Sequence, residues 1–359
     1  MVGGAVGAGS GDEPEPRRAS PATSTPAPAE QEAAEALPLT RQVGRLVVLR
    51  FAGTTAPGYV REVLGEGRAA GAILFRDNLT DAGQAKALTA QLRRGSDPDH
   101  PPLICVDQEG GDIRIVPWAP PERSQAAQAA NNSVRADATA SARALRATGI
   151  NVSLAPVADV ASVPGAALAG RAFSTDFGAA AQQIEESVKG WESGRVAATV
   201  KHFPGLGGAA VNTDDGPATI DRSAQQIRAE DLVPFRAAID AGVPLVMAGH
   251  ALYPALDPDR IASQSPEVID GLLREELGYE GVVITDSTEA ASVQAVSDVR
   301  EAAVRNLRAG VDIVLTTGRG SYIQVYRALL AEARRDPEFR ERVRESAARV
   351  GALQRELAR

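Results

Sequence analysis

The fold of this chain is decided by the stretch Val196-Ala197-Ala198-Thr199-Val200-Lys201-His202-Phe203-Pro204-Gly205. Its first five residues are small or β-branched and predict a buried strand. The run ends in a cation and an imidazole, and the loop-forming residues proline and glycine follow. In parallel α/β proteins, ligands bind beyond the carboxyl ends of the strands, so this stretch indicates a functional site at the end of a core strand.

Seven more apolar runs alternate with amphipathic segments of helical pattern. The runs are residues 46–51, 70–75, 103–106, 152–157, 244–248, 281–285 and 311–315, and the amphipathic segments are residues 59–68, 82–94, 133–148, 179–193, 224–241, 266–277, 299–309 and 322–334. Eight strand-helix units over about 300 residues predict an α/β protein, a (β/α)8 TIM-like barrel. A doubly wound sheet is disfavoured because no glycine-rich phosphate turn follows the first run. A charged terminal helix is expected at residues 338–357.

Composition divides the chain into two regions. Residues 1–38 are rich in Pro, Ser, Thr and Ala and predict a disordered linker, whereas residues 39–359 predict one domain, the barrel with its C-terminal helix. The small apolar residues 2–9 resemble the remnant of a signal peptide, which would make the protein an exported one; otherwise we expect it in the cytoplasm. No run reaches the roughly 18 apolar residues that a membrane span needs, and a monomer is expected.

Charge and composition limit the partners and cofactors. The formal net charge is -8, which argues against nucleic acid as a partner and favours a small polar substrate. One cysteine, Cys105, and three histidines supply few metal ligands, so no metal and no cofactor are expected. Cys105 lies in an apolar run and is expected to be a buried structural thiol.

Ionisable residues follow five of the eight predicted strands. They are Asp107, Asp159, Lys201 with His202, His250, and Asp286. Any one alone could be a cap or a surface charge, but together they indicate a catalytic mouth, because each costs solvation free energy unless it is paired or used. Two separated carboxylates around a Lys-His pair are typical of glycoside cleavage. Asp286 is the expected nucleophile because a rigid strand aims it; its alternative role is to cap the next helix.

Five segments together resemble the signature segments of glycoside hydrolase family 3, and most of all its single-domain bacterial β-N-acetylglucosaminidases. They are Val106-Asp107-Gln108-Glu109-Gly110-Gly111, Ala155-Pro156-Val157-Ala158-Asp159-Val160, Gly170-Arg171-Ala172-Phe173, Lys201-His202-Phe203-Pro204-Gly205 and Gly281-Val282-Val283-Ile284-Thr285-Asp286. The resemblance implies a TIM-like barrel as a single catalytic domain, a retaining mechanism through a glycosyl-enzyme intermediate on Asp286, no cofactor, and release of terminal β-linked N-acetylglucosamine. It further implies that the hydroxyls of the terminal sugar are held by Asp107, Arg171, Lys201 and His202, and that the carbohydrate comes from cell-wall turnover.

The chain departs from the resembled family at its expected proton donor. The family has a histidine where Leu206 stands, and Asp-Ser-His where Asn212-Thr213-Asp214 stands. We therefore expect Asp214 to be the acid/base, with Asp215 in reserve, because most glycosidases use a carboxylic acid whose pKa burial or a nearby charge can raise. An expected substrate-binding arginine is replaced by Ile115, with Arg114 beside it.

Several alternatives stay open on the sequence alone. The chain could be a non-catalytic barrel that binds sugars or peptidoglycan fragments, or a β-glucosidase-like exo-glycosidase of the same family. Retention of Asp286 favours an active hydrolase, since a pure binder needs no aimed nucleophile. Arg171 and Asp159 could form an ion pair that stiffens the rim, and His250 could be a structural histidine whose ring nitrogens are both bonded.

Overall fold

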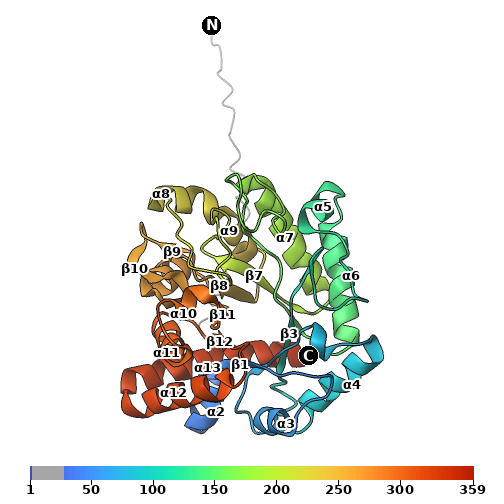
Figure 1. Ribbon diagram of the computed structural model, residues 1–359, viewed down its shortest axis with the longest axis vertical. Helices are drawn as coiled ribbons and strands as arrows, with labels where there is room; N and C mark the ends of the chain where they lie inside the picture. Colours follow the sequence, from blue (N-terminus) through green and yellow to red (C-terminus); the bar gives the residue numbers. More distant parts are fainter. Residues whose placement is uncertain (2–27) are drawn as a thin grey trace.

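The computed structural model describes Met1 and residues 28–359. Its centre is a closed barrel of parallel strands in the order β1-β12-β11-β8-β7-β6-β3-β2 (Figure 1). The strands are β1 (Val47–Arg50), β2 (Gly71–Ile73), β3 (Leu103–Val106), β6 (Val152–Ser153), β7 (Ala197–Phe203), β8 (Leu245–Ala248), β11 (Val282–Ser287) and β12 (Ile313–Leu315). Each overlaps one predicted run, so the predicted (β/α)8 barrel is confirmed.

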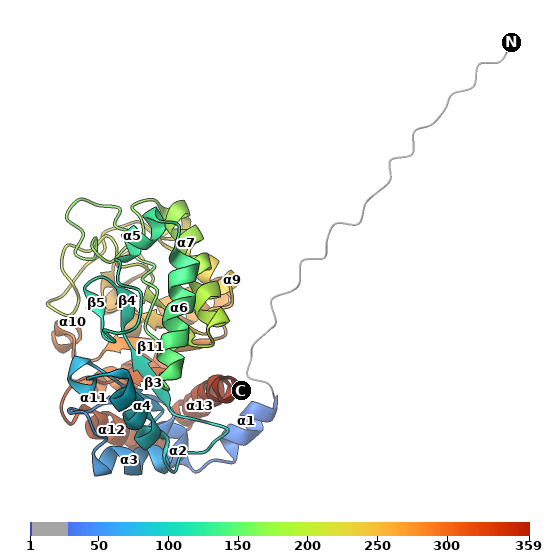
Figure 2. The same cartoon turned by 90° about the vertical axis from the view of Figure 1, so that its right-hand side faces the viewer.

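Helices surround the barrel and connect its strands (Figure 2). They are α2 (Leu39–Gly44), α3 (Gly58–Gly65), α4 (Ala82–Arg93), α5 (Gln125–Ala130), α6 (Val134–Ala147), α7 (Phe177–Ser193), α8 (Ala224–Gln226), α9 (Val233–Asp240), α10 (Ala291–Gln294), α11 (Val299–Arg308), α12 (Ser321–Arg335) and α13 (Pro337–Ala358). Two predicted helices differ from the structure. Residues 224–241 are divided into α8, a π-helical turn and α9, which has a proline in its first turn, and residues 266–277 form the π-helical segment Glu267–Glu276.

Irregular segments and two hairpins stand at the carboxyl ends of the strands. Strand β4 (Gln108–Gly110) pairs with β5 (Ile113–Arg114) after β3, and β9 (Leu252–Tyr253) pairs with β10 (Asp257–Ile261) after β8. Residues 204–220, called the Asp214 loop below, follow β7 and join β9 through a hydrogen bond from the amide of Ile220 to the carbonyl of Leu252, at 2.9 Å. These segments surround the predicted site residues.

Helix α13 closes the amino-terminal end of the barrel. Val350 and Leu353 of this helix pack with residues of the barrel interior, including the buried Cys105. The buried carboxylate of Asp312, just before β12, ties the helix down through ion pairs. Arg342 and Arg349 of the helix each lie 3.2 Å from this carboxylate, and Arg274 of the segment Glu267–Glu276 lies 2.6 Å from it. With this end closed, the carboxyl ends of the strands are left for the candidate site.

The predicted linker extends further in the sequence than the structure supports. Helix α1 (Pro28–Glu35) packs against α13 (Figure 2), because Ala34 is fully buried and Glu30 forms an ion pair with Arg355 at 3.0 Å. The boundary at residue 38 was therefore wrong. The rest of the linker and the signal-peptide hypothesis concern residues 2–27, outside the described residues. None of the described helices combines the length and apolarity that crossing a membrane requires.

Candidate active site

Strand β7 places a buried cation at the centre of the candidate site. All seven residues of the strand are buried, and its last three are Lys201, His202 and Phe203. The Lys201 ammonium lies 2.6 Å from an oxygen of Asp107 and 2.7 Å from an oxygen of Glu109. Burial alone would lower the pKa of Lys201, but the two carboxylates outweigh the effect of burial and raise this pKa. The lysine therefore stays charged in the core of the barrel.

Glu109 joins Lys201 to Arg171, which stands in the long loop after β6. The Arg171 guanidinium donates two hydrogen bonds to the Glu109 carboxylate, at 2.7 and 3.0 Å. Burial would raise the pKa of Glu109, but Lys201 and Arg171 lower it to about 2. The alternative ion pair between Arg171 and Asp159 is not formed, because Arg171 binds Glu109 instead.

His202 connects two further carboxylates. Its Nδ1 lies 2.6 Å from an oxygen of the buried Asp159, and its Nε2 lies 3.7 Å from an oxygen of Asp286. An ionised carboxylate can accept hydrogen bonds but cannot donate them. Asp159 therefore keeps a proton on Nδ1 and turns Nε2 toward Asp286. The ring is thereby fixed between Asp159, in the segment after β6, and Asp286 of β11.

Asp286 stands near the end of β11, where the parallel register pairs Thr285 with Ala248 of β8. The amide of Ser287 donates to the Asp286 carboxylate at 2.7 Å. Burial would raise the pKa of Asp286, but the neighbouring His202, with Lys201 and this amide, outweighs it and holds the pKa below its usual value. The alternative role as a helix cap is wrong, because α10 begins five residues later behind Ala290.

His250 follows β8 and lies behind this carboxylate. Its Nδ1 is 2.8 Å from the Ser263 hydroxyl and its Nε2 is 3.0 Å from the carbonyl oxygen of Ser287. The residue is fully buried, and burial lowers the pKa of the ring. With both nitrogens bonded, His250 fits the structural role and supports the backbone directly after Asp286.

Asp214 stands in the loop after β7. The carbonyl oxygens of Thr213 and Asp214 accept hydrogen bonds from the amides of Ser292 and Ala291, at 3.1 and 3.2 Å, which holds the loop against α10. Although Asp214 is exposed as a residue, partial desolvation of its carboxylate and the negative charge of Asp286 raise its pKa. The neighbouring Asp215 is exposed and adds a smaller contribution of the same sign.

Sequence reasoning did not select Glu109 as a site residue, although it belongs to the quoted segment after β3. The signal was its place three residues after a buried strand, because a carboxylate that is buried there needs a cation as its partner. Arg114, next to the position where an arginine was expected, donates instead to the carbonyl oxygen of Ala119 at 2.9 Å. Among the residues that the structure describes, no cluster of three or more His, Cys, Asp or Glu side chains could hold a metal ion.

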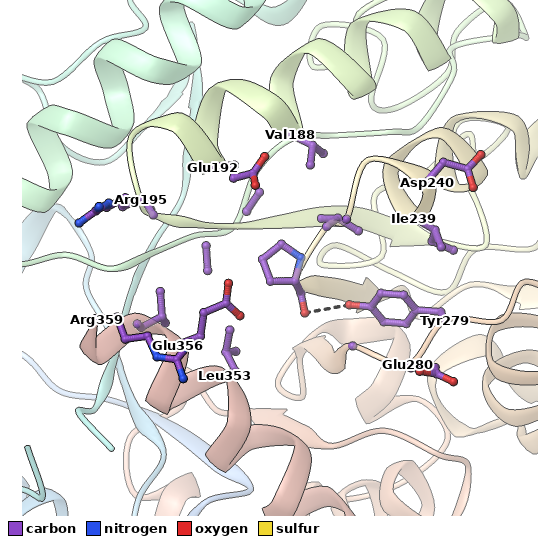
Figure 3. A pocket seen from close by; sticks show the side chains of 18 of the residues that line it. Val188, Glu192, Arg195, Ile239, Asp240, Tyr279, Glu280, Leu353, Glu356 and Arg359 are labelled. Atoms are coloured by element: carbon purple, nitrogen blue, oxygen red, sulfur yellow. Dashed lines mark hydrogen bonds between the residues drawn. The ribbon is translucent and has the colours of Figure 1, made fainter. Parts of the chain in front are cut away.

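A cavity of about 720 Å³ lies beside α13 at the other end of the barrel (Figure 3). It is lined by residues that precede β7, β8 and β11, such as Val196 and Pro244, and by Leu353 of α13. The Tyr279 hydroxyl donates to the Pro244 carbonyl oxygen across it, at 2.9 Å. None of the predicted site residues lines this cavity, so it is separate from the candidate active site.

A TIM-like barrel whose strand ends bring carboxylates together beside buried cations has the architecture of a glycoside hydrolase. Residues 39–353 match the family described as the glycosyl hydrolase family 3 N terminal domain. The chain belongs to this family.

Relatives and solved structures agree with this assignment. The chain is 35% identical over 343 residues to an uncharacterized secreted glycosyl hydrolase of Arthroderma benhamiae, covering 90% of this chain and 96% of that protein. It is 36% identical over 280 residues to a beta-hexosaminidase of Stenotrophomonas maltophilia, covering 75% of this chain and 82% of the relative.

Two solved structures have the same fold. The beta-N-acetylhexosaminidase of Beutenbergia cavernae superposes with a TM-score of 0.81 at 32% identity, covering 89% of this chain and 98% of the other. A family 3 beta-N-acetylglucosaminidase from Paenibacillus sp. superposes with a TM-score of 0.84 at 34% identity, covering 90% of this chain. This chain spans 63% of the length of the Paenibacillus protein.

Proposed function

We propose that the protein is a retaining exo-glycosidase that releases terminal β-linked N-acetylglucosamine, with Asp286 as the nucleophile and Asp214 as the acid/base. The observation that carries the proposal is the position of Asp286 near the end of β11, 3.7 Å from Nε2 of His202, just before the residues that bond the Asp214 loop to α10. Burial and the charge of Asp286 raise the pKa of Asp214, whereas the cationic neighbours of Asp286 lower the pKa of Asp286. Two titratable groups driven apart in this way are suited to the two roles of a glycosidase, one ionised and one protonated. The relatives named beta-hexosaminidase support the choice of sugar.

The chemistry proceeds in two displacements. The Asp286 carboxylate attacks the anomeric carbon while Asp214 gives its proton to the departing glycosidic oxygen, so the C–O bond to the aglycone breaks as the bond to Asp286 forms. A water molecule then attacks the same carbon, Asp214 accepts its proton, and Asp286 leaves as a carboxylate. The product keeps the β configuration of the substrate.

Asp107, Arg171, Lys201 and His202 are proposed to bind the hydroxyls of the sugar. The side chains of Asp107 and Arg171 are 22% exposed, whereas Lys201 is 2% exposed, so Asp107 and Arg171 present polar atoms to the mouth. Below them, Lys201 pairs with Asp107, and Glu109 pairs with Arg171. A carboxylate accepts from two adjacent hydroxyls, and a guanidinium donates to others. A sugar that lacks a matching hydroxyl would leave these groups unpaired and bind poorly.

The substrate class is tested with nitrophenyl β-glycosides of N-acetylglucosamine and glucose. We expect turnover of the first and at least about 10-fold lower kcat/KM for the second, because a pocket fitted to one sugar loses affinity when a contact is missing. Preference for the glucoside would favour the β-glucosidase-like alternative. Binding of N-acetylglucosamine by folded protein without any turnover would favour the non-catalytic barrel.

The first residue prediction concerns Asp214. Asp214→Asn should lower kcat/KM for nitrophenyl N-acetylglucosaminide by about 10²-fold or more, which is the usual contribution of a general acid. The loss should be much smaller with a dinitrophenyl leaving group, because that phenolate departs without a proton. Equal losses on both substrates would contradict the acid/base role. Asp215→Asn is the matched comparison, and it should keep near-normal activity unless Asp215 is the acid.

The pH profile adds a second readout for the same variant. Asp286 must be ionised and its pKa is lowered, so the acidic limb lies below the ordinary range of a carboxyl. Asp214 must be protonated and its pKa is raised, so activity falls as pH rises through that value. Asp214→Asn should therefore remove the alkaline limb and keep the acidic one, measured as kcat/KM against pH.

A further inference from the structure

Asp159 is a buried carboxylate to which the proposed function gives no role. Its side chain is fully buried below the mouth, between the end of β6 and the end of β7. One oxygen accepts hydrogen bonds from the amides of His202 and Leu206, at 3.2 and 2.6 Å, and the other faces Nδ1 of His202 at 2.6 Å. The hydrogen bonds found for this carboxylate therefore all lead to the segment that joins β7 to the Asp214 loop.

The root of the loop is packed tightly against the same place. A Cβ added at Gly207 would lie 2.0 Å from the carbonyl oxygen of Val160, so only glycine allows the two backbones to approach this closely. The Leu206 side chain is buried in the main hydrophobic core. On the other side, the Tyr253 hydroxyl donates to the carbonyl oxygen of Gly205 at 2.8 Å. The loop thus leaves the barrel in a fixed direction.

We propose that Asp159 is a positioning residue that couples the His202 ring, which faces Asp286, to the root of the loop that carries Asp214. The inference rests on the proposed function. A single rigid carboxylate holds both parts, so the distance between the nucleophile and the acid/base depends on it. An error of about 1 Å in such a distance costs on the order of 10²-fold in rate.

The kinetic test uses Asp159→Asn in the full chain. An asparagine of the same shape places an NH₂ group against one of the three donors, so one contact is lost. We expect kcat on nitrophenyl N-acetylglucosaminide to fall about 10²-fold with little change in KM, and a smaller fall on the dinitrophenyl substrate. Combined with Asp214→Asn, it should add little further loss, because both variants disable the same proton transfer. Additive losses, or equal losses on both substrates, would overturn the proposal.

Gly207→Ala provides a second variant if Asp159→Asn does not fold. It leaves Asp159 intact and forces the loop root away from Val160, so the same dependence on the leaving group is expected. The control is Asp240→Asn, an exposed aspartate at the end of α9, which should behave as the wild type in both assays.

Amide hydrogen exchange separates this inference from the proposed function, since it needs no turnover. Residues 205–216 should exchange faster in Asp159→Asn than in the wild type, while the helices keep their protection. Unchanged exchange in this segment would overturn the positioning role, even in a protein without activity. An inactive wild type with faster exchange in the variant would instead contradict only the proposed function.

Discussion

Asp286→Ala is expected to lower kcat for nitrophenyl N-acetylglucosaminide by at least about 10⁴-fold, the scale of losing a nucleophile that works as part of a unit. The strand that aims this carboxylate is paired to β8 and β12 and does not depend on it, so the fold should survive. Circular dichroism and the unfolding midpoint check that it does. Removal of the side chain also opens a small space next to the anomeric carbon.

Azide turns that space into a test of the reaction's geometry. A small anion that enters where the Asp286 carboxylate stood attacks from the same face, and it should give the α-glycosyl azide. In Asp214→Ala the anion should enter from the opposite face, after the glycosyl-enzyme has formed, and should give the β-glycosyl azide. Formation of the same anomer by both variants would show that the roles assigned to the two carboxylates are wrong. Asp240→Ala is the control, which should keep its activity and form no glycosyl azide.

The barrel itself could be predicted because its strands are short apolar runs bounded by helices. In five of these runs the candidate ionisable residue follows within two residues, and that signal is local in the sequence. The π-helical segment Glu267–Glu276 could not be predicted, because its pattern of apolar residues is that of an ordinary helix. The position of α13 across the barrel end could not be predicted either. It involves the ion pair between Asp312 and Arg342, which are 30 residues apart in the chain.

The positions of the candidate site residues along the chain and their contacts are two different predictions. Sequence position indicated which side chains would stand at the rim, but not which would pair. Arg171 lies 62 residues from its partner Glu109, and only the fold shows that Asp159 is taken by His202. Asp159 could therefore be assigned to the wrong partner while its place at a strand end was correct.

The largest expected effect on stability concerns the buried cluster of Glu109, Lys201 and Arg171. Glu109→Gln removes one charge and leaves two cations with less compensation, so the free energy of unfolding should fall by about 3 kcal/mol at pH 7. The pKa of Glu109 is about 2 in the folded protein against an ordinary 4.5, so its contribution is fully present above about pH 5 and is lost as pH falls toward 2. The difference between variant and wild type should therefore shrink over that range, measured by urea unfolding.

A double variant separates charge compensation from simple damage to the core. Lys201→Met alone leaves Glu109 with Arg171 as its main cation and should also destabilise the fold strongly. Combined with Glu109→Gln, the total loss should be clearly less than the sum of the two single losses, because each change removes the charge that the other leaves unpaired. Glu186→Gln, which breaks an exposed ion pair with Arg135, should cost less than about 1 kcal/mol. Additive losses in the double variant would mean that packing, rather than the pairing of charges, holds this part of the barrel together.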